Sequence, residues 1–157
     1  TTKIDGPEGL TCFVEGVDML QSLVSGIEYG VDILNDLEGN FVSNCVKRKL
    51  LMRAGETDKS TVLYHQKIEE LSRKISAAFR HVGNLDLDII ETDTGELICI
   101  DFNPRFGGGY PATHLAGMNY LQAIINFVRG GKVTLPERPN EITVMKGISL
   151  HVREGVQ

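Results

Sequence analysis

A group of polar residues near the middle of the chain has the types and spacing that could hold a metal ion beside a phosphate. Asp88 lies in one strand-like run, and Asp101 and Asn103 lie in the next. Hard divalent cations prefer oxygen ligands, and Mg²⁺ typically takes one or two carboxylates together with phosphate oxygens and water. Arg105 follows shortly after, where a guanidinium could neutralise charge on a transferring phosphoryl group. The next residues, Gly107 to Gly109, would let backbone N–H groups approach an anion closely.

The placement of these residues depends on a predicted β-hairpin. Two strand-like runs, Leu85 to Ile90 and Leu97 to Phe102, flank a polar Thr-Asp-Thr-Gly turn. Side chains alternate along a strand, so Asp86 and Asp88 share one face of the first strand. Asp101 and Asn103 share one face of the second strand in the same way.

The register of the hairpin decides whether the two polar faces coincide. They coincide if Glu91 pairs with Glu96 or with Ile98, and a shift of one residue puts them on opposite sides. Carboxylates that converge on one face repel each other and need a cation or water between them. A solvated hairpin face followed by a glycine turn is the alternative that the pattern leaves open.

Composition is typical of a soluble globular domain. The chain has 157 residues, of which 41% are hydrophobic and 24% charged, which is enough for one domain with a buried core. The net charge is −5 and the basic runs are no longer than Lys47 to Lys49, so a nucleic-acid partner is not favoured. Because the first residue is Thr1 rather than Met, we expect residues 1–157 to be a single domain of a longer protein.

Cysteine usage and hydropathy indicate a cytoplasmic protein. The three cysteines, Cys12, Cys45 and Cys99, lie far apart and lack metal-ligand spacing, which indicates free thiols in a reducing compartment. The sequence shows neither a stretch with the length of a transmembrane helix nor a signal peptide, so no membrane partner is expected.

Hydrophobic periodicity predicts helices that alternate with hairpins. The clearest helix begins at Ser60 or Thr61 and runs to about Val82, because its apolar residues repeat at helical spacing and Gly83 follows them. The other predicted elements are a helix at Glu15 to Ser22, strands at Glu28 to Leu34 and Phe41 to Lys49, a loop at Leu50 to Lys59, a helix from Asn119 to Val128, and a last strand at Thr143 to Val152. Because both hairpins are antiparallel, we expect an α+β fold, an antiparallel sheet with helices packed on one face and the acidic residues on the other.

The string IDFNPRFGGGYPATHLAG, from Ile100 to Gly117, resembles the ATP-grasp superfamily of carboxylate ligases, and most closely its carbamoyl-phosphate synthase large-subunit branch. In that family an acidic strand end followed by Asn-Pro-Arg binds Mg²⁺ and the phosphates of ATP. The resemblance covers about Leu20 to Gly131 and implies the C-terminal lobe of a two-lobed clamp. It also implies partner lobes, N-terminal in the same full-length chain, that carry a glycine-rich flap and further phosphate contacts.

Carried over residue by residue, the resemblance assigns Asp88, Asp101 and Asn103 to Mg²⁺, with Asn103 also contacting ATP. Arg105 matches the arginine that contacts the γ-phosphate, and the resemblance implies this residue as the catalytic one. The family usually has Glu at the position of Asp101 and often Gln at that of Asp88. The shorter aspartate would place the metal differently or bind it more weakly.

The resemblance also extends upstream, to residues that would hold the adenosine of ATP. The segment LVSGIEYGVDIL puts Leu23 at a backbone contact with adenine and Glu28 at the ribose hydroxyls. Arg48, near the end of the following strand, is expected either to contact a phosphate or to be a solvated strand end.

The implied activity is that of an ATP-dependent carboxylate ligase. A small-molecule carboxylate would attack the γ-phosphate of ATP, held with Mg²⁺ or Mn²⁺, to give an acyl phosphate and ADP, and an amine or ammonia would then displace phosphate. The alternative is a noncatalytic module that binds a nucleotide or a metal. We expect this chain alone to be inactive, because one lobe cannot exclude water from the reaction.

Overall fold

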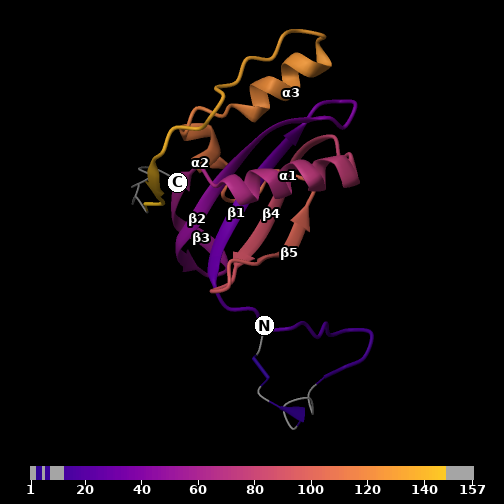
Figure 1. The fold of residues 1–157 in the computed structure, drawn as a ribbon, viewed down its shortest axis with the longest axis vertical. Helices are drawn as coiled ribbons and strands as arrows, with labels where there is room; N and C mark the ends of the chain where they lie inside the picture. The colour runs from indigo at the N-terminus through magenta and orange to yellow at the C-terminus, as the bar shows by residue number, and fades with distance from the viewer. Residues whose placement is uncertain (1–2, 5, 8–12, 148–157) are drawn as a thin grey trace, which may run out of the picture.

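The computed structural model describes residues 3–4, 6–7 and 13–147. Within this part of the chain, the strands form a six-stranded antiparallel sheet in the order β5-β4-β1-β2-β3-β6 (Figure 1). The predicted α+β fold is confirmed. The elements are β1 (Ile27–Asn35), β2 (Phe41–Arg53), β3 (Glu56–Leu63), α1 (Gln66–Phe79), β4 (Gly83–Glu91), β5 (Leu97–Asn103), α2 (Tyr110–Leu115), α3 (Tyr120–Val128) and β6 (Thr143–Met145).

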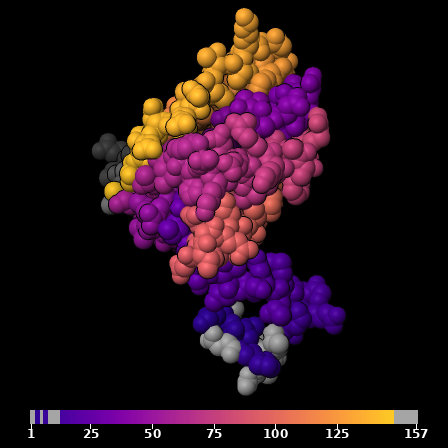
Figure 2. Space-filling model, in the orientation of Figure 1, coloured from indigo at the N-terminus to yellow at the C-terminus, as the bar shows by residue number. Residues whose placement is uncertain are grey.

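One face of the sheet is covered by α1, which lies in front of the strands in Figures 1 and 2. The helix packs Ile68 against alternate residues of β1, among them Val31 and Ile33, because every second side chain of a strand points to the same face. His65 caps the start of the helix, where its Nδ1 accepts a hydrogen bond from the backbone N–H of Ile68 at 3.4 Å. Arg80, in a left-handed conformation, ends the helix.

The other two helices lie on the opposite face of the sheet. Together with the residues around them, α2 and α3 cover Leu34, Cys45 and Val62. Met118, between the two helices, and Tyr120, at the start of α3, are fully buried in this second cluster. The helices are therefore divided between the two faces, whereas the sequence placed them on one. The part of the second face that α2 and α3 leave uncovered carries the polar residues.

The strand β3 was not predicted. The sequence indicated a loop at Leu50 to Lys59 and an early start for the long helix, and both predictions are wrong. Instead β2 continues to Arg53, and a tight turn at Ala54 and Gly55, with φ values of 51° and 80°, leads into β3. The helix begins only at Gln66, because residues of β3 alternate between buried and partly exposed positions and pair with β2.

The helix predicted at Glu15 to Ser22 does not occur in the described part of the chain. Residues 13–26 lead away from the sheet (Figure 1), and the side chains of Val17, Met19 and Leu20 are exposed. A short amphipathic helix gains most of its stability from packing, so a segment with exposed apolar side chains has little reason to be helical.

The remaining predicted strands, and the helix that begins after Asn119, are confirmed with small changes in their ends. Asn119 caps α3 as expected, since its Oδ1 accepts a hydrogen bond from the backbone N–H of Gln122 at 3.0 Å. Of the last predicted strand, Thr143 to Val152, only β6 lies in the structure, and the portion from residue 148 onward is outside the described residues. The helices of the described ranges are too short or too polar to cross a membrane.

A partly buried histidine is expected to make the stability of this fold sensitive to acid. His81 Nε2 lies 3.2 Å from the carbonyl oxygen of Ile33, and Nδ1 lies 3.4 Å from Asn35 Nδ2, an arrangement that suits a neutral ring. Burial lowers the pKa of His81, although the bond to Ile33 opposes this. A group whose pKa is lowered by folding favours the unfolded protein once the pH falls below its ordinary value of about 6.5.

We predict that the free energy of unfolding falls between pH 7.5 and pH 5.5, and that His81→Gln removes part of this fall. Urea unfolding at several pH values measures the effect. The matched control is His114→Gln, because His114 is exposed on α2 and its replacement should leave the pH dependence unchanged. An identical pH dependence in wild type and His81→Gln would contradict the assignment.

Candidate functional site

The pairing of β4 with β5 begins in a register that would separate the acidic residues. Glu91 lies opposite Leu97, which is neither of the partners that the sequence analysis considered. Regular pairing from that point would place Asp88 opposite Ile100 and on the other face from Asp101. A β-bulge in β5, where Ile100 is the extra residue between the partners of Ile89 and Asp88, shifts the register by one residue and prevents this.

Beyond the bulge, the polar side chains share one face of the sheet. Asp88 lies opposite Asp101, and Asp86 lies opposite Asn103. Asn103 Nδ2 donates a hydrogen bond to Asp101 Oδ2 at 2.7 Å. The convergence expected from the sequence is therefore present, and an irregularity in the strand produces it.

These residues line a cavity of about 340 Å³ on the face that α2 and α3 leave open. Its floor comes from the central strands, and its rim comes from the β2–β3 hairpin and the glycine-rich loop. The lining residues are Gly30, Lys47, Lys49, Met52, Gly55, Glu56, Thr57, Ser60, Asp86, Asp88, Asp101, Asn103, Arg105, Gly108 and Gly109.

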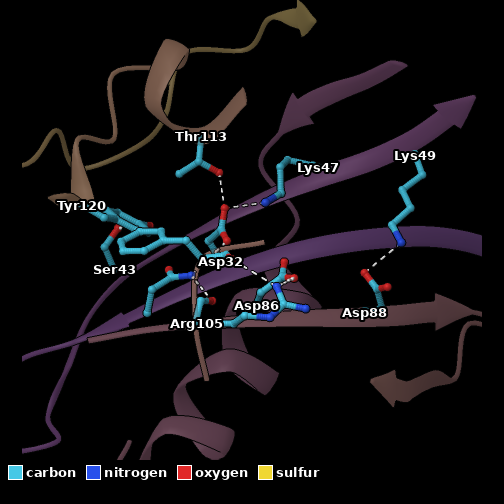
Figure 3. Close-up of polar contacts among 11 residues, drawn as sticks. Asp32, Ser43, Lys47, Lys49, Asp86, Asp88, Arg105, Thr113 and Tyr120 are labelled. Carbon is cyan, nitrogen blue, oxygen red and sulfur yellow. Dashed lines mark hydrogen bonds and ion pairs between the residues drawn. The ribbon is translucent and has the colours of Figure 1, made fainter. Parts of the chain in front are cut away.

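A buried carboxylate beside the cavity, that of Asp32 in β1, contacts residues of β2, β4 and α2 (Figure 3). It is fully buried, forms an ion pair with Lys47 and accepts a hydrogen bond from the hydroxyl of Thr113 on α2. Asn84 Nδ2 donates to Asp32 Oδ1 at 3.2 Å and to the carbonyl oxygen of Arg105 at 3.0 Å. This network was not predicted from the sequence, although an aspartate inside the apolar run EYGVDIL was a signal for it.

A second ion-pair group lies farther along the same strands. Lys49 Nζ is 2.9 Å from Asp88 Oδ1 (Figure 3). The same atom is 2.6 Å from Glu28 Oε1. Burial lowers the pKa of Lys49, but the hydrogen bonds to Asp88 and Glu28 outweigh this and raise the pKa overall. Lys49 is therefore a firmly protonated cation between two carboxylates.

Asp86 supports the loop that carries the arginine. Arg105 Nη1 lies 3.7 Å from Asp86 Oδ2, and Gly107 lies directly against the same carboxylate. Burial raises the pKa of Asp86, and the charge of Asp32 adds to the rise, while Lys47 opposes it. A partly desolvated carboxylate thus lies beneath the guanidinium and the start of the glycine run.

The structure brings most of the predicted site residues together. Asp88, Asp101, Asn103 and Arg105 all line the cavity, and Glu28 reaches it through Lys49. Among the described residues, no three His, Cys, Asp or Glu side chains gather in an arrangement that could hold a metal by themselves. A cation here would need ligands of other kinds, including the carboxamide.

Two predicted residues lie apart from the cavity. Leu23 is 70% exposed on the segment that precedes β1. Arg48 lies opposite Tyr29 and shares its face of the sheet, the face that α1 covers, so alternation places Arg48 on the other side from the lysines that flank it.

Together, the antiparallel sheet and the acidic hairpin that ends in Asn-Pro-Arg define a protein of the ATP-grasp class. Residues 17–150 match the family model described as ATP-grasp in the biosynthetic pathway with Ter operon, and the chain belongs to this family. The resemblance to the ATP-grasp superfamily is thereby confirmed, whereas the closer resemblance to carbamoyl-phosphate synthase stays a prediction. No curated protein matches the sequence.

Solved structures share the fold at low sequence identity. Pyruvate carboxylase from Rhizobium etli superposes with a TM-score of 0.59 at 24% identity, over 75% of this chain and 13% of that one. The biotin carboxylase domain of the Hydrogenobacter thermophilus 2-oxoglutarate carboxylase was solved in complex with MgADP, ADP and bicarbonate. It superposes with a TM-score of 0.58 at 16% identity, over 73% of this chain and 28% of that one. The ATPase subunit of phosphoribosylaminoimidazole carboxylase from Aquifex aeolicus superposes with a TM-score of 0.54 at 16% identity, over 68% of this chain and 34% of that one. The chain thus spans about a third or less of each of these proteins.

The close approach of Gly107 to Asp86 gives a test of this geometry. A Cβ atom added at Gly107 would lie 2.0 Å from Asp86 Oδ2, whereas one at Gly108 would lie 3.9 Å from its nearest neighbour. We predict that Gly107→Ala displaces the loop and lowers the free energy of unfolding by about 1–3 kcal/mol, as overpacking does elsewhere. Gly108→Ala is the matched control and should have little effect. Chemical denaturation measures both, and equal stability of the two variants would contradict the close packing of Gly107 against Asp86.

Proposed function

We propose that this chain forms the nucleotide- and Mg²⁺-binding half of an ATP-dependent carboxylate ligase. The supporting observation is the convergence of Asp88, Asp101 and Asn103 on one wall of a cavity whose rim carries Arg105 and the glycine loop, in a chain of the ATP-grasp family. A carboxylate substrate would attack the γ-phosphate of ATP, giving an acyl phosphate and ADP. An amine or ammonia would then attack the acyl carbon and release phosphate.

The acidic wall fits a hard divalent cation. Asp88 and Asp101 offer carboxylate oxygens from opposite positions of paired strands. Because Asn103 donates its amide N–H to Asp101, its carbonyl oxygen is left as the group that could bind a cation. A set of two carboxylates and a carboxamide leaves room for phosphate oxygens and water, which Mg²⁺ requires and Mn²⁺ accepts. When bound, such an ion would neutralise charge on the phosphates.

The cationic residues of the cavity would position the phosphates. Arg105 lies at the end of β5, where its guanidinium could contact the transferred phosphoryl group in the transition state. Lys47 and Lys49 share this face, so they suit phosphate contact better than Arg48, which lies on the α1 side of the sheet. The adenine contact at Leu23 and the ribose contact at Glu28 stay part of the proposal.

The rest of the active site would come from N-terminal lobes of the same full-length chain. This chain aligns with only about a third or less of the length of each solved relative, and an open cavity cannot by itself exclude water from an acyl phosphate. We therefore propose that this chain alone is inactive and that the complete protein acts in the cytoplasm on a small-molecule carboxylate and an amine or ammonia.

A noncatalytic nucleotide- or metal-binding module is the second candidate. The aspartate at position 101, which is shorter by one methylene than the glutamate that the family resemblance implies there, favours it. Titration of the complete protein with Mg-ATP, followed by measurement of ADP release with panels of carboxylic acids and amines, separates the two. Tight binding without ADP release under every substrate mixture would support the module.

We predict that Asp101→Ala in the complete protein preserves the fold and lowers ATP turnover by about 100-fold or more, because an anionic group that holds the phosphates' counter-ion is lost. Asp101 is exposed on the cavity wall, so its removal should cost little stability. Circular dichroism and steady-state ADP release measure the two effects.

The matched control is Asp93→Ala, which removes an exposed aspartate from the turn of the same hairpin. Its turnover should equal that of the wild type. Wild-type turnover in Asp101→Ala would rule out the proposed role of the acidic wall.

A further inference from the structure

We propose that the ammonium of Lys49 takes the place of the metal ion beside Asp88. It forms an ion pair with Asp88 while the site lacks nucleotide, and it changes partner to a phosphate when the metal and the nucleotide bind together. This inference rests on the proposed function and adds an order of binding to it. Divalent metal alone would bind weakly, and nucleotide would bring the metal in.

The ion pair between Lys49 and Asp88 spans three strands. Lys49 extends from β2 and Asp88 from β4, and β1 lies between them in the sheet. Lys49 therefore has to cross over β1 to reach the carboxylate at 2.9 Å. On the way its ammonium also contacts Glu28 of β1 at 2.6 Å, and only 8% of the lysine side chain is exposed.

Gly30 makes this crossing geometrically feasible. It is the residue of β1 that lies opposite Lys47 on one side and Asp88 on the other. A Cβ at this position would lie 3.6 Å from Lys49 Cε and 3.7 Å from Asp88 Oδ1, so any larger side chain would occupy the path of the lysine. Because Gly30 has no side chain, the side chain of Lys49 has room to pass over β1 at this position.

The position of Lys49 puts it in competition with a cation. Asp88 is one of only two carboxylates assigned to the metal, and its Oδ1 already accepts a charge-assisted hydrogen bond. A free divalent ion competes with the ammonium for this carboxylate, and an ammonium that it displaced would keep one carboxylate partner, Glu28. A nucleotide changes the balance, because its phosphates offer the displaced ammonium new anionic partners within the same cavity.

The decisive variant is Lys49→Gln, studied in the complete protein that carries this chain. Glutamine is one bond shorter than lysine and stays polar, but it carries no charge, so it removes the cation from beside Asp88. Electron paramagnetic resonance of Mn²⁺ measures the affinity for the free ion, and the same titration with ADP present measures the affinity for the metal–nucleotide pair.

We expect Lys49→Gln to bind free Mn²⁺ about tenfold more tightly than wild type, since an opposite charge at this distance shifts the equilibria of a carboxylate by about that factor or more. The same variant should bind Mn-ADP about tenfold more weakly, because a phosphate contact is lost. Lys49→Arg, which retains the charge, should bind free Mn²⁺ as weakly as wild type. The matched control is Lys67→Met, on the outer side of α1, which should change neither affinity.

Opposite changes in the two affinities would support the inference, since a purely structural lysine would lower both. Unchanged or weaker binding of free Mn²⁺ by a folded Lys49→Gln, with normal binding of Mn-ADP by wild type, would overturn the inference and leave the proposed function intact. Failure of wild type to bind Mn-ADP at all would overturn the proposed function, and the inference with it. If Lys49→Gln does not fold, as judged by circular dichroism, Lys49→Met provides the same comparison.

Discussion

The carboxylate of Asp32 holds together the elements that build the cavity. It lies fully buried in the central strand, pairs with Lys47 on the neighbouring strand and accepts a hydrogen bond from Thr113 on α2. Through Asn84 it is also connected to the backbone of Arg105. A buried ion pair that loses one partner typically costs about 3–5 kcal/mol, because the remaining charge is desolvated and unpaired. The position of the arginine loop therefore depends on a group that points away from solvent.

Around this network, the cavity places the cationic side chains of one strand near the anionic side chains of two others. Lys47 and Lys49 come from β2, the aspartates come from β4 and β5, and Gly30 leaves space between them. Such an arrangement keeps charged groups on a partly buried surface without a ligand, because each carboxylate has a cationic or hydrogen-bonding neighbour. The same groups can exchange partners when a polyanion and a cation arrive together.

Much of the fold could be predicted from local sequence signals. The two predicted hairpins and the cap of α3 follow from alternation, turn and asparagine signals that act over a few residues. The end of the long helix was predicted too late, at about Val82, because α1 ends at Phe79 with Arg80 as its left-handed cap and Gly83 already lies in β4. The strand β3 and the exposed segment before β1 were mispredicted, because pairing with β2 in one case and exposure of the apolar side chains in the other decided the outcome. The first outcome depends on contacts between residues distant in sequence, and the second on the lack of such contacts among the described residues.

The candidate site was predictable in its residues but not in its geometry. The string from Asp101 to Arg105 indicated the chemistry, while the bulge at Ile100 that aligns the two strands has no local signature. The partners of Asp32 and the reach of Lys49 across β1 depend on the order of strands in the sheet, which no single segment encodes.

The central claim is that the open face of the sheet holds a metal–nucleotide pair against Asp88, Asp101 and Asn103. A crystal structure of the complete protein with Mn²⁺ and a non-hydrolysable ATP analogue tests it most directly, because anomalous scattering locates the metal without assumption. We expect the ion within coordination distance of the Asp101 carboxylate and the phosphates beside Arg105. A nucleotide bound elsewhere, or a metal that contacts none of the residues of this wall, would contradict it.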